Sequence, residues 1–144
     1  MKRYLALDVG DATVGVAVSD PLGITAQGVE TIRRRNLEAD LRRLRELMDL
    51  YETKSLVIGL PRNMNGSQGE RCDVVRAFAG EVEKAVPDAE IDFWDERLST
   101  VAASRSLLEA DLSRRKRKKV IDKMAAVFIL QGYLDRLSKD ARRD

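Results

Sequence analysis

Three acidic residues, Asp8, Glu96 and Asp122, are the strongest candidates for chemistry in this sequence. Their carboxylate oxygens are hard donors that suit Mg²⁺ or Mn²⁺. Clustered carboxylates can hold two such ions about 3.5–4 Å apart, one to activate water and one to stabilise the leaving oxygen of a phosphodiester. The sequence has no histidine and one cysteine, which excludes Ser–His and Cys–His catalysis and cysteine-rich zinc sites. We therefore expect carboxylates and a hard metal ion to carry any hydrolysis.

Asp122 is the most informative acid, because of the helix on which it is expected. The apolar residues that follow it recur at helical spacing and form a core-facing stripe: Ala125, Ala126, Ile129, Leu130, Tyr133 and Leu134. Asp122 precedes the first two by three and four residues, so it lies on the same inward face. A carboxylate there needs a hydrogen bond, a cation or a metal ion. The alternative is a first-turn aspartate that offsets the helix dipole, paired with Lys118 or Lys123.

The other two acids also have structural interpretations when each is taken alone. Asp8 could cap a tight turn before Gly10. Glu96 could be an exposed acid at a strand end, paired with Arg97. Its neighbour Asp95 would point the opposite way on an extended chain, and the sequence does not choose between Asp95 and Glu96.

An α/β domain is expected to position these acids. Apolar runs and alternation predict strands at residues 4–9, 13–18, 28–33, 54–59 and 90–94. Helical spacing predicts helices at 37–51, around 74–82, from 99 to about 110 and from about 118 to 137. In the third strand we expect Val29 and Thr31 on one face, with Glu30 and Ile32 on the other. This order predicts a single domain over residues 1–144, with a five-stranded mixed sheet and helices on both faces.

The connections between strands predict where the acids meet. A hairpin reverses direction, and each crossover through a helix restores it, so the first, third, fourth and fifth strands point the same way. The loops after Val9, Gly59 and Trp94 then emerge at one edge of the sheet. In open α/β sheets this carboxyl edge is where ligands bind. Two of the three acids therefore share a ligand-binding edge.

Basic residues near the acids suggest a polyanionic partner. The formal net charge is only +2, but residues 33–35 are three arginines and residues 114–119 are six consecutive cations. Such blocks are usually solvated loops, yet beside a carboxylate cluster they would hold phosphates on either side of a cut. Loop 59–69 lacks a P-loop motif, and it is either a phosphate contact or a turn-rich connection. The expected substrate contacts are Arg62, Arg97, Arg114, Arg115, Lys116, Arg117, Lys118, Lys119 and Lys123.

Six segments, in order over nearly the whole chain, resemble the YqgF/RuvX family: Leu7-Asp8-Val9-Gly10, Gly15-Val16-Ala17-Val18-Ser19-Asp20, Ile58-Gly59-Leu60-Pro61, Asn65-Gly66-Ser67, Asp95-Glu96-Arg97-Leu98-Ser99-Thr100 and Asp122-Lys123-Met124-Ala125-Ala126. The last two are the most specific. The resemblance implies an RNase H-like fold related to Holliday junction resolvases and a role in processing the 5′ end of pre-16S rRNA. It also implies Asp8, Glu96 and Asp122 as the metal-binding acids. The chain departs from the family pattern at Asp11, which is a further candidate acid.

The leading expectation is a metal-dependent nuclease that uses Mg²⁺ or Mn²⁺ on precursor rRNA. The alternatives are a resolvase that cuts branched DNA and a nucleic-acid-binding module without catalysis. A sugar-kinase-type phosphotransferase also begins with Asp-x-Gly, but it needs a second domain for which 144 residues leave no room. The apolar runs are too short to cross a bilayer, so we expect a cytoplasmic monomer or homodimer that binds no membrane.

Overall fold

The computed structural model describes residues 2–63, 65–98 and 114–143, and for residues 114–123, 142 and 143 it describes the backbone alone. In chain order the elements are β1 (Leu5–Val9), β2 (Thr13–Ser19), β3 (Ala26–Arg33), α1 (Leu37–Leu50), β4 (Ser55–Leu60), α2 (Glu70–Ala85), β5 (Glu90–Asp95), the short 3₁₀ helix η1 (Glu96–Leu98) and α4 (Arg114–Arg143). The helix expected from residue 99 to about 110 lies outside the described residues. No described helix combines the length and apolar character needed to cross a membrane.

The five strands form one mixed sheet in the order β3-β2-β1-β4-β5. β2 is antiparallel to both of its neighbours, β1 and β3, whereas β4 is parallel to both β1 and β5. β1, β3, β4 and β5 therefore point the same way, as predicted. Their carboxyl ends share one edge of the sheet, which we call the carboxyl edge.

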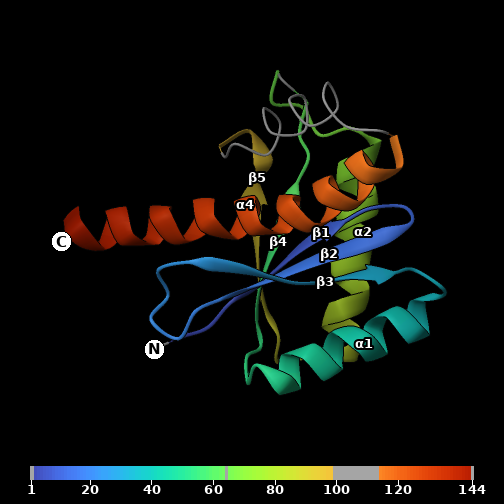
Figure 1. The fold of residues 1–144 in the computed structure, drawn as a ribbon, viewed down its shortest axis with the longest axis horizontal. Coiled ribbons are helices and arrows are strands. Elements are labelled where there is room, and N and C mark those ends of the chain that lie inside the picture. The colour runs from blue at the N-terminus through green and yellow to red at the C-terminus, as the bar shows by residue number, and fades with distance from the viewer. Residues whose placement is uncertain (1, 64, 99–113, 144) are drawn as a thin grey trace.

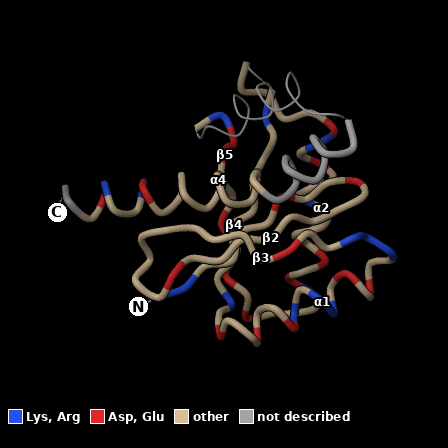
Figure 2. Tube along the Cα trace, in the orientation of Figure 1, with Lys and Arg blue, Asp and Glu red and all other residues tan. Residues whose placement is uncertain are grey.

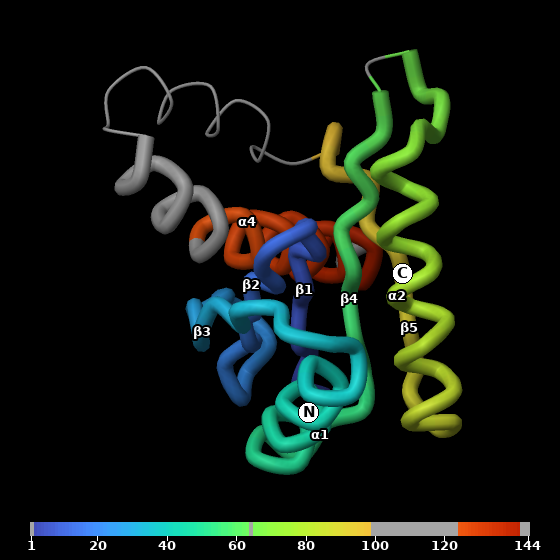
Figure 3. Tube along the Cα trace, turned by 90° about the vertical axis from the view of Figure 1, so that its right-hand side faces the viewer, coloured from blue at the N-terminus to red at the C-terminus, as the bar shows by residue number. Residues whose placement is uncertain are grey.

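Helices cover both faces of the sheet, as the strand patterns predicted. On one face, Leu5 and Leu7 of β1 pack with residues of α1 and α2 around Leu44 and Phe78. On the other face, residues of β1, β2, β4 and β5 pack against α4: Ala6, Ala17, Val57 and Trp94. Figure 1 shows α4 crossing the strands in front and α2 behind them, and Figure 3 shows the same layers from the side.

α4 confirms the apolar stripe but begins earlier than expected. The stripe residues that are buried against the sheet are Ala125, Ala126, Ile129, Leu130 and Leu134. The helix begins at Arg114 rather than near Lys118, because consecutive lysines and arginines are good helix formers and do not break a helix. Asp122 thus lies eight residues after the first residue of the helix. Its interpretation as a first-turn aspartate is therefore wrong.

The expected alternation of β3 is interrupted at Val29. The pairing of β2 with β3 shifts between Val16, opposite Glu30, and Ala17, opposite Gly28. Val29 is the extra residue of this β-bulge, and a bulge changes which face the following residues occupy. Val29 and Ile32 consequently pack against the same core cluster. The prediction that they face opposite sides of the sheet is wrong.

Gly59 of β4 marks a close approach of α4 to the sheet. A Cβ atom at this position would lie 2.5 Å from Cδ1 of Ile129 and 3.2 Å from Cγ of Glu96. Ile129 is completely buried, so its side chain has little room to move aside. The absence of a side chain at residue 59 therefore lets α4 lie this close to β4.

We expect Gly59→Ala to lower the free energy of unfolding by about 1–3 kcal/mol, because the added methyl group overpacks the contact with Ile129. Urea unfolding followed by circular dichroism measures this change. Gly80→Ala is the matched control, since a Cβ atom there in α2 meets nothing within 4 Å. That variant should be more stable than the wild type by about 0.5–1 kcal/mol, because alanine is the better helix former. Equal effects of the two substitutions would contradict this account of Gly59.

Candidate functional site

Asp8 lies in a row of residues that crosses the sheet near its carboxyl edge. It pairs with Gly15 of β2, and continuing the β1–β4 register by one residue brings it level with Gly59, which pairs with Trp94. Because Leu7 beside it packs against the α1 and α2 face, strand alternation directs Asp8 to the α4 face. Asp8 is half-buried. Its carboxylate thus stands on the α4 face with a glycine on each neighbouring strand.

Glu96 lies on the other side of Gly59 from Asp8. It follows β5 as the first residue of η1, and only 5% of its surface is exposed. Its Cγ atom lies 3.2 Å from the position that a Cβ atom of Gly59 would take. Neighbouring strands are about 4.8 Å apart, so Asp8 and Glu96 lie on either side of Gly59, over which Ile129 packs. The structure brings these two acids to one face and one edge of the sheet.

Asp95, the alternative to Glu96, is paired with Arg97. The Arg97 Nη2 atom lies 2.7 Å from Asp95 Oδ2, and the Arg97 backbone N–H donates to Oδ1 at 3.0 Å. The bonds from the Arg97 guanidinium hold the pKa of Asp95 below its ordinary value, and Arg62 adds a smaller effect. The interpretation of Glu96 as an exposed acid paired with Arg97 is therefore wrong: Glu96 is buried, and Asp95 takes the arginine.

The loop between β4 and α2 forms a compact turn beside these residues. The Gly66 backbone N–H donates to the Asn63 carbonyl at 2.8 Å, and Gly66 has the positive φ of 87° that favours glycine. Asn63 and Ser67 also bond to each other through their side chains, at 3.0 Å. These bonds support the interpretation of the loop as a turn-rich connection.

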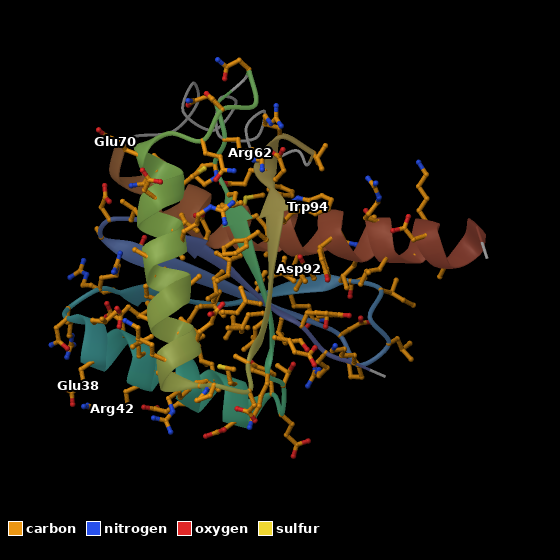
Figure 4. All side chains as sticks on the ribbon, turned by 180° about the vertical axis from the view of Figure 1, so that it is seen from behind. Glu38, Arg42, Arg62, Glu70, Asp92 and Trp94 are labelled. Carbon is orange, nitrogen blue, oxygen red and sulfur yellow. The ribbon has the colours of Figure 1, made fainter. Side chains whose placement is uncertain are left out.

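Arg62 and Arg97, two expected substrate contacts, lie at the carboxyl edge near Trp94. A Cβ atom at Gly66 would be 3.2 Å from Arg97 Nη1, so η1 and the β4–α2 loop touch there. Arg62 is half-buried, and its Nε atom is buried without a hydrogen-bond partner in the described part of the chain. Figure 4 shows Arg62 above Trp94 at this edge. Arg62 is thus a cation near Asp95 that retains hydrogen-bonding capacity.

Asp11, the acid at which the chain departs from the family pattern, pairs with Arg71 of α2. Arg71 Nη1 lies 2.8 Å from Asp11 Oδ1, and its Nη2 atom donates to the Val9 carbonyl at 3.3 Å. Arg34 Nη1 donates to the Gly10 carbonyl at 2.8 Å. Two arginines therefore hold the turn that follows Asp8. Sequence reasoning missed both roles, because it treated Arg34 only as part of a basic block and did not consider Arg71.

The third expected acid can be located only by its backbone. Position 122 lies seven residues before Ile129 on α4, which is two helical turns earlier on the same face. The side chain of Asp122 is outside the described part of the chain, and so are those of residues 114–119 and Lys123. Among the described residues, no three His, Cys, Asp or Glu side chains form a group that could hold a metal ion. The expected three-acid set therefore stays a prediction.

Comparison with known proteins shows which family this chain resembles. The model of the RuvX family, described as Holliday junction resolvase, matches residues 2–136. A protein of Moorella thermoacetica is 61% identical over 138 residues, which cover 96% of this chain and 98% of the relative. A protein of Clostridium botulinum strain Eklund 17B is 56% identical over 137 residues, which cover 95% and 99%. Both relatives are named as candidate pre-16S rRNA nucleases.

A solved structure agrees with the fold. T. thermophilus RuvC, in complex with a Holliday junction substrate, matches with a TM-score of 0.56 at 13% sequence identity, covering 96% of this chain and 97% of that one. At this identity the likeness shows the fold, which is RNase H-like, as the sequence motifs implied. The family match extends over nearly the whole chain, and both relatives are more than half identical to it. The chain belongs to the RuvX family.

Proposed function

We propose that this protein is a metal-dependent nuclease that processes the 5′ end of pre-16S rRNA in the cytoplasm. The observation that carries the proposal is the pair of carboxylates, Asp8 and Glu96, on either side of Gly59 at the carboxyl edge. The names of the M. thermoacetica and C. botulinum relatives support RNA as the substrate.

The residues present fit a divalent ion. Asp8 and Glu96 bring two carboxylates to one face of the sheet, on either side of Gly59. Carboxylate oxygens are the donors that Mg²⁺ and Mn²⁺ prefer over softer ligands. We propose that Asp8, Glu96 and Asp122 hold the metal. A bound ion would supply an activated water and stabilise the negative charge that develops on the scissile phosphate.

The protein's own groups would hold this arrangement in place. Glu96 is nearly fully buried, so its carboxylate has little freedom to turn away from this face of the sheet. Arg34 and Arg71 fix the backbone carbonyls of the turn that follows Asp8. Arg62, at the same edge of the sheet, offers donors to a substrate phosphate. A cation there neutralises backbone charge and aligns the strand without reading its sequence.

Asp122 would complete the set from the helix that covers this face. Its position two turns before Ile129 puts it on the sheet-facing side of α4. The basic residues 114–119 precede it on the same helix. We propose that these cations, together with Lys123, bind phosphates of the strand next to the metal.

A resolvase that cuts branched DNA is the second candidate, favoured by the description of the RuvX family and by the fold shared with RuvC. A four-way junction presents two related strands, so a resolvase needs two sites, which a homodimer supplies. A strictly monomeric protein would count against this activity. A binding module without catalysis is the third candidate, and it would bind nucleic acid equally well with EDTA and cleave with no divalent ion.

We expect Asp8→Asn and Asp122→Asn each to fold normally and to lose Mn²⁺-dependent cleavage, because an amide replaces a metal-binding carboxylate. Cleavage of a labelled precursor rRNA measures activity. Mn²⁺ quenching of Trp94 fluorescence measures binding independently, since Trp94 is the only tryptophan in the sequence and pairs with Gly59. Both variants should need more Mn²⁺ for half-maximal quenching.

Asp11→Asn is the matched control for these substitutions. It makes the same chemical change at the same edge, but Asp11 is exposed and paired with Arg71. This variant should retain cleavage and Mn²⁺ affinity. Full activity of Asp8→Asn or Asp122→Asn would refute the metal site.

Neutralising residues 114–119 with glutamine should weaken RNA binding and flatten its dependence on salt. Each lost contact with a single strand reduces the slope of log K against log [salt] by about 0.7, because fewer counterions are released. Fluorescence anisotropy over a range of KCl concentrations measures the slope. An unchanged slope would show that this block does not contact the substrate.

The substrate is tested by giving the purified protein a labelled pre-16S rRNA fragment and a four-way DNA junction, each with Mn²⁺ or with EDTA. We expect cleavage of the RNA near the mature 5′ end, and only with the metal. Preferential cutting of the junction by a homodimer would instead support the resolvase.

A further inference from the structure

A second group of arginines lies at the carboxyl edge, at the end of β3. We call residues 33–35 the arginine corner, because all three are arginines where β3 turns toward α1. Arg33 is the last residue of β3 and pairs with Thr13, and the Arg34 backbone N–H donates to the Ala12 carbonyl at 2.9 Å. Figure 2 shows this run of positive charge beyond the labelled end of β3. The corner is thus bonded directly to the turn that follows Asp8.

Arg34 anchors the corner by pointing inward. Its Nη1 atom donates to the Gly10 carbonyl at 2.8 Å, and its Nε atom lies 3.4 Å from Asp40 Oδ2. The guanidinium also stacks over the ring of Phe78, with its carbon 5.3 Å from the ring centroid. These contacts join β3, the β1–β2 turn, α1 and α2. Arg34 is therefore a fixed structural cation.

The buried acid beside the corner serves this anchor. Asp40 is 4% exposed, and its second oxygen accepts the Arg35 backbone N–H at 3.1 Å. Its single negative charge is therefore matched by the guanidinium of Arg34, which is the cation that contacts it. The charges of Arg33 and Arg35 are left to solvent or to a ligand.

Arg33 and Arg35 are exposed and, within the described residues, neither makes an ion pair. The nearby arginines of α1 differ: Arg42 pairs with Glu38, and Arg43 pairs with Glu30 and Glu46. Two guanidinium groups without an ion-pair partner, on residues two apart in a hydrogen-bonded backbone, favour a polyanion, because little entropy is lost in ordering the binding surface.

Arg33 lies on the face of the sheet that carries Asp8. Ile32 packs toward α1 and α2, so Arg33 occupies the opposite face, the one that carries Asp8. The register places Asp8 level with Gly15 and Thr31. Arg33 is therefore two strands across from Asp8, about 10 Å, and two residues further along, about 7 Å. A strand bound at Asp8 and running along this edge would pass Arg33 within a few nucleotides.

We propose that Arg33 and Arg35 bind the phosphodiester backbone of the substrate strand at a position away from the bond that is cut. This inference rests on the proposed nuclease function and adds a second contact surface to it, separate from residues 114–119. Arg34 contributes by holding the corner, not by touching the substrate.

The test compares Arg33→Gln/Arg35→Gln with Arg45→Gln/Lys139→Gln, both in an Asp8→Asn background that prevents cleavage. The control pair removes the same charge from exposed positions, Arg45 in the middle of α1 and Lys139 near the C-terminal end of α4. The probe is a fluorescein-labelled RNA that spans the mature 5′ end of 16S rRNA, together with two versions shortened from either side. Anisotropy at several KCl concentrations gives the salt slope for each probe.

We expect the corner variant to reduce the magnitude of the salt slope on the full probe by about 1.4, which corresponds to two lost contacts with a single strand. Shortening the probe on the side that reaches Arg33 and Arg35 should weaken RNA binding by the Arg45→Gln/Lys139→Gln control variant. RNA binding by the corner variant should stay nearly unchanged, because this variant has already lost those contacts. A slope equal to that of the control pair would overturn the inference. A reduced slope would also overturn the inference if the corner variant and the control variant responded equally to probe length. Such a result would reflect a general effect of charge and not a contact at the corner.

Failure of this inference is distinguishable from failure of the proposed function. With Asp8 intact, the corner variant should still cleave the shortened probe, since it should bind that probe with the same affinity as the wild type. Mn²⁺ should also quench its Trp94 fluorescence normally. If the nuclease proposal were wrong, the wild type would not cleave any probe. If only the corner were uninvolved, the wild type would cleave and the corner variant would bind every probe as the control pair does.

Discussion

The close approach of α4 to β4 is the constraint on which the rest of the structure depends. At Gly59 there is no space for even one methyl group, because the fully buried side chain of Ile129 occupies it. The contact sets the height of the helix above the sheet. The same glycine lies between Asp8 and Glu96. One glycine thus serves both the packing of the core and the geometry of the candidate metal site.

Several acids near the carboxyl edge pair with arginines. Asp11 and Asp95 each contact an arginine, whose positive charge compensates theirs. Asp40 is buried and would be costly to keep ionised without the guanidinium of Arg34, since a buried charge needs a partner. These pairs also tie the β1–β2 turn and η1 to their surroundings. The acids that carry the proposed chemistry therefore stand on a framework held by other ion pairs.

The fold and the function rest on different kinds of observation. The likeness to T. thermophilus RuvC at 13% identity shows that a similar arrangement of strands and helices arises from very different side chains. Folds host many activities, so the architecture alone leaves the substrate open. The family match and the two acids beside Gly59 indicate that the substrate is a nucleic acid. The exposed arginines around the same edge are consistent with a strand that extends beyond the cut.

The sequence by itself determined the order of strands and helices, the stripe of α4 and the meeting of Asp8 and Glu96 at one edge. Each of these follows from local periodicity or from the direction rule for crossovers, which need no knowledge of partners. Only the tertiary structure decided that Arg97 pairs with Asp95, that Val29 lies in a bulge, and that Arg34 turns inward while Arg33 stays exposed. These outcomes depend on cross-strand register and on competition among neighbouring charges, which involve residues far apart in the chain. The physical reason is that periodicity assigns a residue to one face of a strand or helix. Its partner there depends on which side chains from other elements pack against that face.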